Sequence, residues 1–253
     1  MTTRYVRYEQ NGRAAFGRLE GDRIAGLSAA PWDGGRPTGA DVPAADVRLL
    51  APCTPSKVIA VGLNYKSHLQ GRPEAGYPGI FLKLPTSIVG PDADVVLPPG
   101  AGNVHYEGEM VVVIGRRASR VSRAEAAGCI FGVTCGNDIS ERDWQKKDLQ
   151  WFRAKASDTF GPLGPAVVQG LDYTDLQLQT RVNGEVRQSA RTKDLIFPID
   201  EIVSFVTTFV TLEPGDIIYT GTPGTTQAMQ PGDVVEVELE GVGVLRNRIA
   251  AGA

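Results

Sequence analysis

The sequence contains few of the residues that form soft-metal sites, disulfides or redox motifs. It has two histidines, His68 and His105, and three cysteines, Cys53, Cys129 and Cys135, with no CxxC spacing. Two histidines are too few for a His-rich zinc or copper site, so any metal ion would be held mainly by oxygen ligands. An odd number of cysteines at these separations is typical of reduced, buried side chains, and it predicts a cytoplasmic protein.

The sequence also lacks a strong charge of either sign and a long apolar run. The 253 residues carry a formal net charge of -3, so we expect no basic surface and no nucleic-acid partner. No apolar stretch approaches the ~20 residues that span a bilayer, so we expect no membrane segment. The opening residues, MTTRYVRYEQNGR, contain no apolar core of a secretory signal. A globular protein with a small-molecule partner is the remaining expectation.

The pattern of apolar residues predicts a mostly β protein with a few short helices, in the α+β class. Residues 3–27 alternate between apolar and polar side chains with turn residues between them, which is typical of short strands. Residues 31–46, PWDGGRPTGADVPAAD, are rich in Pro and Gly and are predicted to form a linker. We therefore expect a small N-terminal β domain with its linker in residues 1–50 and the main domain in residues 51–253.

Strand signals also outnumber helix signals in the main domain. Asn183-Gly184 is the expected turn of a hairpin. One helix is predicted to begin at Ser122, which forms a capping box with Glu125, and another lies over residues 198–210, where apolar residues recur at the helical period. Further strands are predicted at residues 58–61, 79–84, 94–97, 110–114, 130–135 and 166–169. So few helices argue against a doubly wound fold.

Two carboxylates precede the most apolar of these strands, in the stretch NVHYEGEMVVVIG. Glu107 and Glu109 are two residues apart, so on a strand they point to the same face, roughly 6.5–7 Å apart. Burying an ionised carboxylate costs several kcal/mol unless it is paired or bound to a metal. The two residues therefore lie either on a solvated strand edge or beside a cation.

A third carboxylate, Asp138, follows the strand in VTCGNDISERDWQ. It could simply cap the short polar helix that is expected after it. If the two strands are neighbours, however, Glu107, Glu109 and Asp138 converge at one strand end. Three carboxylates would require a divalent cation, and Mg²⁺ or Mn²⁺ suits such oxygen ligands.

Each of three other residues has a simple structural explanation, and two of them also have a functional one. Lys155, among the aromatic residues of WFRAKASDTFGPLGP, is either a surface lysine or a cation directed at a substrate carboxylate or oxyanion. Thr222, in YTGTPGTT, lies either in a simple turn or in a cradle of N–H groups and a hydroxyl for a carboxylate. His68 on its own is most simply a capping or core histidine. The glycines of GTPGT and GNDIS do not match phosphate-loop or dinucleotide patterns, which argues against nucleotide cofactors.

The sequence resembles the fumarylacetoacetate hydrolase family over residues 57–245. The matching motifs occur in order and at the right separations: VGLNYKSH, FLKLPTSIVG, HYEGEMVVVIG, GVTCGNDISERDWQ, WFRAKASDTFGPLGP, RVNGEVRQ, EPGDIIYTGTP and PGDVVEVELEGVG. The resemblance implies a mixed β roll or sandwich, a homodimer, and a small leading domain like that of the longer bacterial members.

The resemblance also implies roles for ten residues. They comprise catalytic residues, substrate-binding residues and ligands for Mg²⁺ or Mn²⁺. The catalytic residues are His68 and Lys155; the substrate-binding residues are Tyr65, Lys83, Arg142, Gln145 and Thr222; the metal ligands are Glu107, Glu109 and Asp138.

The sequence departs from the family pattern close to His68. Many relatives have a glutamate three residues after the catalytic histidine, on a lid helix, whereas this sequence has Gly71, followed by Pro73. Gly and Pro both disfavour a helix, so we expect the lid to be a loop. Glu74 or another acid could replace the missing glutamate, or the dyad could be absent.

The resemblance implies chemistry that passes through an enolate. When a bond at C3 of a 2-oxo acid breaks, the electrons move to the keto oxygen, where a metal ion and Lys155 stabilise them. The first hypothesis is hydrolysis of a C–C bond in an acylpyruvate such as fumarylpyruvate or maleylpyruvate, giving pyruvate and a carboxylic acid in aromatic catabolism. The alternative is decarboxylation or tautomerisation of oxaloacetate or a related 2-oxo dicarboxylate. A non-enzymatic binding protein would be expected to have lost the carboxylates, and all three are present.

Overall fold

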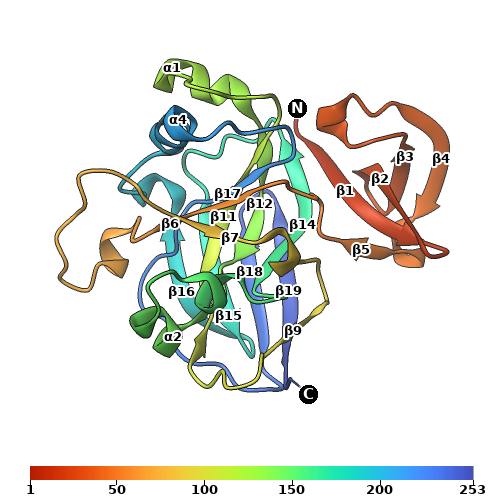
Figure 1. Ribbon diagram of the computed structural model, residues 1–253. Helices are drawn as coiled ribbons and strands as arrows, with labels where there is room; N and C mark the ends of the chain where they lie inside the picture. Colours follow the sequence, from red (N-terminus) through yellow and green to blue (C-terminus); the bar gives the residue numbers. More distant parts are fainter. Residues whose placement is uncertain (253) are drawn as a thin grey trace.

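The computed structural model describes residues 1–252, and its strands form three β-sheets (Figure 1). The largest has twelve strands in the order β4-β3-β2-β1-β14-β12-β11-β17-β6-β7, with β5 beside β1 and β8 beside β14. A five-stranded sheet has the order β16-β15-β18-β19-β9, and β10 pairs with β13. The prediction of a mostly β protein with short helices is confirmed.

The elements have the following bounds. The strands are β1 (Thr3–Gln10), β2 (Arg13–Glu20), β3 (Arg23–Leu27), β4 (Pro37–Pro43), β5 (Arg48–Leu50), β6 (Val58–Gly62), β7 (Gly79–Lys83), β8 (Ile88–Val89), β9 (Asp94–Val96), β10 (Val104–His105), β11 (Gly108–Ile114), β12 (Ile130–Asn137), β13 (Ser140–Glu141), β14 (Gly161–Gln169), β15 (Gln177–Val182), β16 (Glu185–Arg191), β17 (Ile217–Tyr219), β18 (Val234–Leu239) and β19 (Gly243–Ala250). The α-helices are α1 (Arg123–Ala126), α2 (Arg142–Lys147), α3 (Phe152–Ala156) and α4 (Ile199–Phe209).

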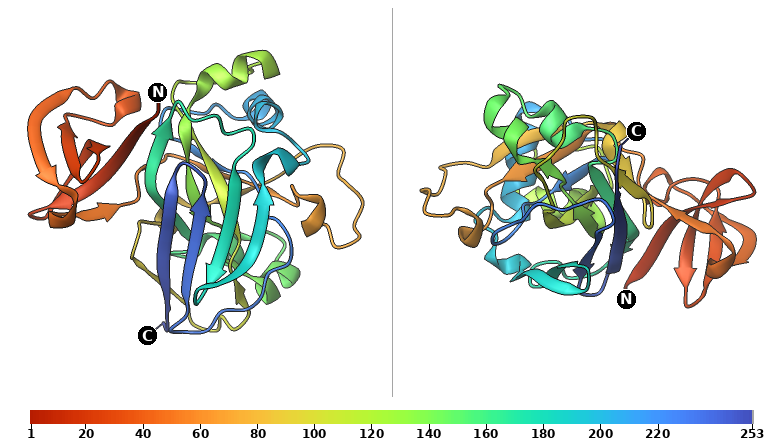
Figure 2. Two further views of the ribbon diagram at one scale, coloured as in Figure 1. Left: turned by 180° about the vertical axis from the view of Figure 1, so that it is seen from behind. Right: turned by 90° about the horizontal axis from the view of Figure 1, so that it is seen from below.

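The twelve-stranded sheet is the main sheet. Its first five strands form a lobe at one side of the molecule, and β1 joins this lobe to the other strands by pairing with β14 (Figures 1 and 2). The prediction of a linker over residues 31–46 is wrong, because this stretch contains β4, which pairs with β3. Pro37 and Pro43 are the two end residues of β4. Because β4 is the last strand of the sheet, its outer edge needs no ladder hydrogen bonds and tolerates proline.

Strand β11 lies at the centre of the main sheet and is buried on both faces. Met110, Val112 and Ile114 pack into one apolar cluster with α4 and the five-stranded sheet. Val111 and Val113 pack into a second cluster on the opposite face. The strand predicted at residues 110–114 is therefore confirmed, and the core packing on both faces supports the residues at the end of β11.

Other local predictions hold as well. Ser122 and Glu125 form the capping box of α1, and α4 buries its apolar stripe in the core. Strands β15 and β16 form the predicted hairpin around Asn183-Gly184. No helix within residues 1–252 has the length and apolar character that crossing a membrane requires.

A buried aspartate ties together the two parallel strands that lead into the site. The Asp216 carboxylate accepts hydrogen bonds from the backbone N–H groups of Ser56, Lys57 and Glu213, and its Oδ2 lies 2.7 Å from Lys57 Nζ. Burial acts to raise the pKa of Asp216, but these hydrogen bonds hold it below its usual value. Asp216 immediately precedes β17 and Lys57 immediately precedes β6, so the carboxylate fixes where both strands begin.

Candidate active site

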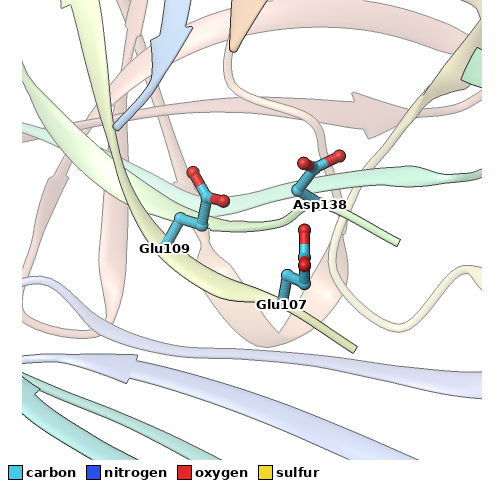
Figure 3. A group of neighbouring side chains, drawn as sticks. All are labelled: Glu107, Glu109 and Asp138. Carbon is cyan, nitrogen blue, oxygen red and sulfur yellow. The ribbon is translucent and has the colours of Figure 1, made fainter. Parts of the chain in front are cut away.

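Three buried carboxylates from neighbouring strands meet at one end of the main sheet (Figure 3). Glu109 lies on β11 opposite Gly136 of β12, and Asp138 directly follows β12. The backbone N–H of Asp138 donates to the carbonyl of Glu107 at 2.8 Å, which joins the two segments. One oxygen from each carboxylate lies within 4.8 Å of the others, and the residues are 1–4% exposed. Together, Glu107, Glu109 and Asp138 form the carboxylate trio.

The simpler explanations for these acids are wrong. A solvated strand edge would leave Glu107 and Glu109 exposed, and both are buried. Asp138 does not cap the following helix, because Glu141 is the N-cap residue of α2 and accepts the N–H of Trp144. Burial of all three acids in their ionised forms therefore requires compensating positive charge.

Buried cations surround two members of the carboxylate trio. Lys155 Nζ lies 2.5 Å from Glu107 Oε2 and 2.6 Å from Asp138 Oδ2. Lys83 Nζ lies 2.7 Å from Asp138 Oδ1, and Arg142 forms an ion pair with Glu107 Oε1. Both lysines are 2% exposed, so the surface-lysine explanation for Lys155 is also wrong.

The pKa values of Lys155 and Glu107 shift toward their ionised forms. Burial opposes the charge on the Lys155 ammonium, but Asp138 and Glu107 raise its pKa overall. Burial likewise opposes the charge on the Glu107 carboxylate, but the Lys155 and Arg142 cations lower its pKa overall. The pairing therefore favours the charged forms of both Lys155 and Glu107.

Glu109 has a different environment. Its carboxylate accepts one backbone hydrogen bond, from Gly221 at 2.7 Å, and within residues 1–252 it takes part in none of the ion pairs of the carboxylate trio. Burial and the like charges of Asp138 and Glu107 raise its pKa well above the usual value. A buried carboxylate with no cation partner, next to two others, fits a site for a hard divalent cation.

His68 lies in a short 3-10 helix, η3 (Lys66–His68), at the edge of the site. Its Nδ1 lies 2.5 Å from the carbonyl oxygen of Gly224, and a carbonyl only accepts, so Nδ1 carries the ring proton. The other nitrogen, Nε2, is then the proton acceptor and lies 3.6 Å from Glu107 Oε1. The Gly224 carbonyl thus orients the imidazole.

The segment after His68 is a loop rather than a lid helix, as expected. Residues 69–78 contain no helix, and the loop projects from the side opposite the N-terminal lobe (Figures 1 and 2). Gly71 has φ of +83°, a conformation that a glutamate rarely adopts. Glu74 pairs with Lys66 at 3.1 Å, so it does not replace the missing glutamate.

The carboxylate trio lines a cavity of about 480 Å³. Among the predicted site residues, the cavity is also lined by His68, Arg142, Gln145, Lys155 and Thr222. Tyr65 and Lys83 are not in this lining, and each is 2% exposed. Lys83 supports Asp138 and donates to the carbonyl of Lys155, so a direct substrate contact of either residue stays a prediction.

Thr222 is fixed by a side chain that sequence reasoning did not single out. Gln188 Nε2 donates to Thr222 Oγ1 at 2.7 Å, and its Oε1 accepts the N–H of Gly108 at 3.0 Å. The Thr222 hydroxyl in turn donates to the carbonyl of Gly108 at 2.8 Å. This hydroxyl is thus engaged inside the protein, and carboxylate binding through the Thr222 N–H stays a prediction.

Gly108 itself has to be a glycine. A Cβ at this position would lie 1.9 Å from Thr180 Oγ1 on the neighbouring sheet. Gly108 is therefore packed against Thr180, and its backbone is held by hydrogen bonds to Gln188 and Thr222. These contacts fix the backbone between Glu107 and Glu109. The motif NGEVRQ contains Gln188, but nothing in its local pattern indicates this contact.

Comparisons with known proteins place the chain in a family. The family model described as fumarylacetoacetate (FAA) hydrolase C-terminal matches residues 57–250, and a model described as Rv2993c-like, N-terminal, matches residues 3–52. The mitochondrial oxaloacetate tautomerase FAHD2A of Bos taurus is 42% identical over 223 residues, which cover 82% of this chain and 71% of that protein.

Two solved structures are similar over nearly the whole chain. A structure titled 5-carboxymethyl-2-hydroxymuconate delta-isomerase, from Mycobacterium smegmatis, superposes with a TM-score of 0.93 at 46% identity and covers 98% of this chain and 99% of its own. A maleylpyruvate hydrolase from Sphingobium sp. SYK-6, in complex with manganese(II) and pyruvate, gives a TM-score of 0.83 at 28% identity and covers 99% of this chain and 100% of its own.

Proposed function

The chain belongs to the fumarylacetoacetate hydrolase family, and we propose that within this family it is a Mg²⁺- or Mn²⁺-dependent enzyme that interconverts the enol and keto forms of a 2-oxo dicarboxylic acid. Oxaloacetate is the simplest substrate of this class. The observation that carries the proposal is the environment of His68, whose imidazole is oriented by a neutral carbonyl. Hydrolysis of an acylpyruvate, the first hypothesis from the sequence, is the second candidate.

The charge of the site supports a dianionic substrate. With every group ionised, the three carboxylates are balanced by three cations, namely Lys83, Lys155 and Arg142. A divalent cation would add two positive charges to a buried site, where net charge is costly. A substrate with two negative charges restores neutrality, which an uncharged ketone would not do.

The His68 environment favours proton transfer at C3 over activation of water. A carboxylate that accepts from Nδ1 stabilises the imidazolium that forms when Nε2 takes a proton, whereas a backbone carbonyl at Nδ1 orients the ring with less stabilisation. The C3 proton of a chelated 2-oxo acid is already acidified, so a weaker base suffices for it. Attack of water on a C4 carbonyl requires a stronger base or a better-stabilised imidazolium.

The relatives support the same class of reaction. The Bos taurus relative is named an oxaloacetate tautomerase, and the Mycobacterium smegmatis structure is titled an isomerase of a 2-hydroxymuconate, which is by its name an enol. Both names describe movement of a proton between an enol and a keto form, without loss of a fragment. Both relatives are more than 40% identical to this chain.

In this proposal each residue has a stated task. A divalent ion bound to the carboxylate trio would supply Lewis-acid stabilisation of the enolate oxygen. His68 Nε2 accepts or returns the C3 proton, because Nδ1 is held as a donor by Gly224. The Lys155 ammonium adds positive charge next to Glu107 and Asp138, where the substrate's keto end would be bound.

The second candidate, hydrolysis of an acylpyruvate, has its own support. The maleylpyruvate hydrolase from Sphingobium shares the fold over the whole chain and was solved with manganese(II) and pyruvate. His68 is also present in the cavity lining, next to Glu107. Hydrolysis would release pyruvate and a carboxylic acid, so analysis of the products distinguishes it from tautomerisation.

A substrate panel tests the proposal. The protein, with Mg²⁺ or Mn²⁺, is expected to speed the decay of enol absorbance of oxaloacetate while oxaloacetate itself is conserved, as measured by malate dehydrogenase. Fumarylpyruvate and maleylpyruvate are expected to give no pyruvate in an assay with lactate dehydrogenase. Pyruvate from either acylpyruvate, with no effect on oxaloacetate, would select the second candidate; no effect on any of the three contradicts both.

We also propose a cytoplasmic homodimer. The cytoplasmic location is supported by Cys53, Cys129 and Cys135, which are free and buried, and a membrane-bound or secreted pool in fractionated cells would contradict it.

The proposed dimer is supported by exposed apolar side chains near strand β7, which ends the main sheet. Leu82 is 61% exposed and Phe152 is 65% exposed. Light scattering is expected to give twice the chain mass, and Leu82→Glu to halve it; a monomeric wild type rejects the dimer.

A further inference from the structure

One wall of the cavity is a chain of hydrogen-bonded side chains that the proposed reaction does not use. Asn103 Nδ2 donates to Asp143 Oδ1 at 3.1 Å, and Asn103 Oδ1 lies 2.8 Å from His105 Nε2. His105 Nδ1 lies 2.9 Å from Thr226 Oγ1, and Arg142 Nη2 donates to the same oxygen at 2.9 Å. Asn103, His105, Thr226 and Arg142 all line the cavity.

The direction of every proton in this chain follows from its end at Asp143. A carboxylate accepts, so the amide nitrogen of Asn103 faces Asp143 and the amide oxygen faces His105. The His105 Nε2 must therefore carry a proton. In the Nε2–H tautomer, Nδ1 is the accepting ring nitrogen, and it accepts the Thr226 hydroxyl proton. The lone pairs of Thr226 are left for Arg142.

Arg142 is the group that this chain orients. Its Nη1 donates to Gln145 Oε1 at 2.9 Å, and its Nη2 contacts both Thr226 Oγ1 and Glu107 Oε1. A divalent cation that engages Glu107 would compete for the Glu107 contact. Gln145 and Thr226 are then the two neutral acceptors that hold the guanidinium, and they leave its remaining N–H groups free for a ligand.

The backbone reinforces the same contact. The N–H of Met229 donates to the carbonyl of Val104 at 2.8 Å, and His105 forms an isolated β-bridge with Ala228. Thr226 therefore lies in a loop that the strand of His105 holds in place. The loop lies between the motifs EPGDIIYTGTP and PGDVVEVELEGVG and is part of neither.

We propose that His105 is a positioning residue and Thr226 a specificity-determining residue, which together direct Arg142 at the second carboxylate of the substrate. The inference rests on the proposed function for the identity of the ligand, a 2-oxo dicarboxylate. The hydrogen-bond chain itself does not depend on that identity. The two parts are therefore tested separately.

The hydrogen-bond chain can be tested by NMR without any substrate. The protein has only two histidines, so the ring nitrogens of uniformly ¹⁵N-labelled protein give two sets of signals that His105→Phe assigns. At neutral pH His105 is expected to be the Nε2–H tautomer and His68 the Nδ1–H tautomer. Thr226→Val should shift the His105 Nδ1 signal and leave His68 unchanged, whereas Thr226→Ser should preserve both. A His105 ring protonated on Nδ1, or one insensitive to Thr226→Val, overturns the chain.

The specificity role is tested by kinetics and by binding of oxalate, which lacks a second, distant carboxylate. Thr226→Val and His105→Phe are each expected to raise the KM for oxaloacetate about 10-fold to 100-fold, because each removes one hydrogen bond that positions a charged group. The kcat should change less than about 3-fold. The Kd of oxalate, read from Trp fluorescence, should stay the same, and Thr226→Ser should restore KM.

The double variant distinguishes positioning from general damage. Because His105 acts through Thr226, Thr226→Val combined with His105→Phe should raise KM no more than either change alone. Fully additive losses, or a fall in kcat at constant KM, contradict the proposal. If the wild-type protein acts on no 2-oxo dicarboxylate, the proposed function fails, while the NMR result still decides whether His105 and Thr226 are coupled.

Discussion

Replacing Glu109 with glutamine is expected to stabilise the metal-free protein and to abolish its metal-dependent activity. Glu109 is buried beside Glu107 and Asp138, and it accepts a single backbone hydrogen bond. Glutamine keeps an oxygen for the Gly221 N–H and removes the like charge. Without the third carboxylate, however, the site loses a ligand for the divalent cation that the reaction requires.

The two effects have opposite signs and are measured separately. In EDTA, Glu109→Gln is expected to raise the free energy of unfolding by about 1–3 kcal/mol, or the melting temperature by about 2–8 °C. With Mn²⁺ at about 100 times the wild-type Kd, the wild type gains about 2.7 kcal/mol and the variant gains much less. Turnover of oxaloacetate enol is expected to fall on the order of 1000-fold.

Glu107→Gln is the matched control, because it makes the same chemical change two residues away. Glu107 pairs with Lys155 and Arg142, so its removal leaves two buried cations with less compensation. In EDTA, Glu107→Gln is therefore expected to lower the free energy of unfolding by the few kcal/mol that breaking a buried pair costs. Its melting temperature should fall accordingly. Equal shifts for the two variants, or an undiminished Mn²⁺ effect in Glu109→Gln, would reject the assignment of the carboxylate trio.

The position of Glu107 and Glu109 could be anticipated because the signal is local. Alternation on a strand places them on one face, and the apolar run from Met110 to Ile114 places that strand in the core. Asp138 could be added only on the condition that β11 and β12 are neighbours. Sequence spacing does not state that condition, and the structure meets it.

The residues that were missed act across long separations in the chain. Gln188 contacts Gly108 and Thr222, and His105 contacts Thr226, through side-chain hydrogen bonds that leave no periodic pattern. The resemblance implied a substrate-binding role for Lys83, but its contact with Asp138 arises only from the fold. The linker prediction over residues 31–46 failed for the opposite reason, since Pro and Gly there mark an edge strand and its turns.

Replacing His68 with alanine is expected to separate proton transfer from decarboxylation. Loss of a general base costs typically 10²–10⁴-fold, so enol–keto interconversion and any acylpyruvate cleavage should fall by about that factor. Decarboxylation of oxaloacetate requires the metal ion but no base, so any such activity should change less than about 3-fold. Enol absorbance, pyruvate and CO₂ are measured on the same samples.

Glu74→Gln is the control for this experiment, because Glu74 is the first acid after His68 in the sequence and could have replaced the missing glutamate. Glu74 pairs with Lys66, and the Glu74 side chain is 48% exposed. Glu74→Gln is therefore expected to leave every activity within about 2-fold of the wild-type value. Gly71→Glu is expected not to strengthen the base, since φ of +83° disfavours the new side chain. A large loss of activity in Glu74→Gln would show that Glu74, and not the Gly224 carbonyl, orients His68. Full tautomerase activity of His68→Ala would show that His68 takes no part in the reaction.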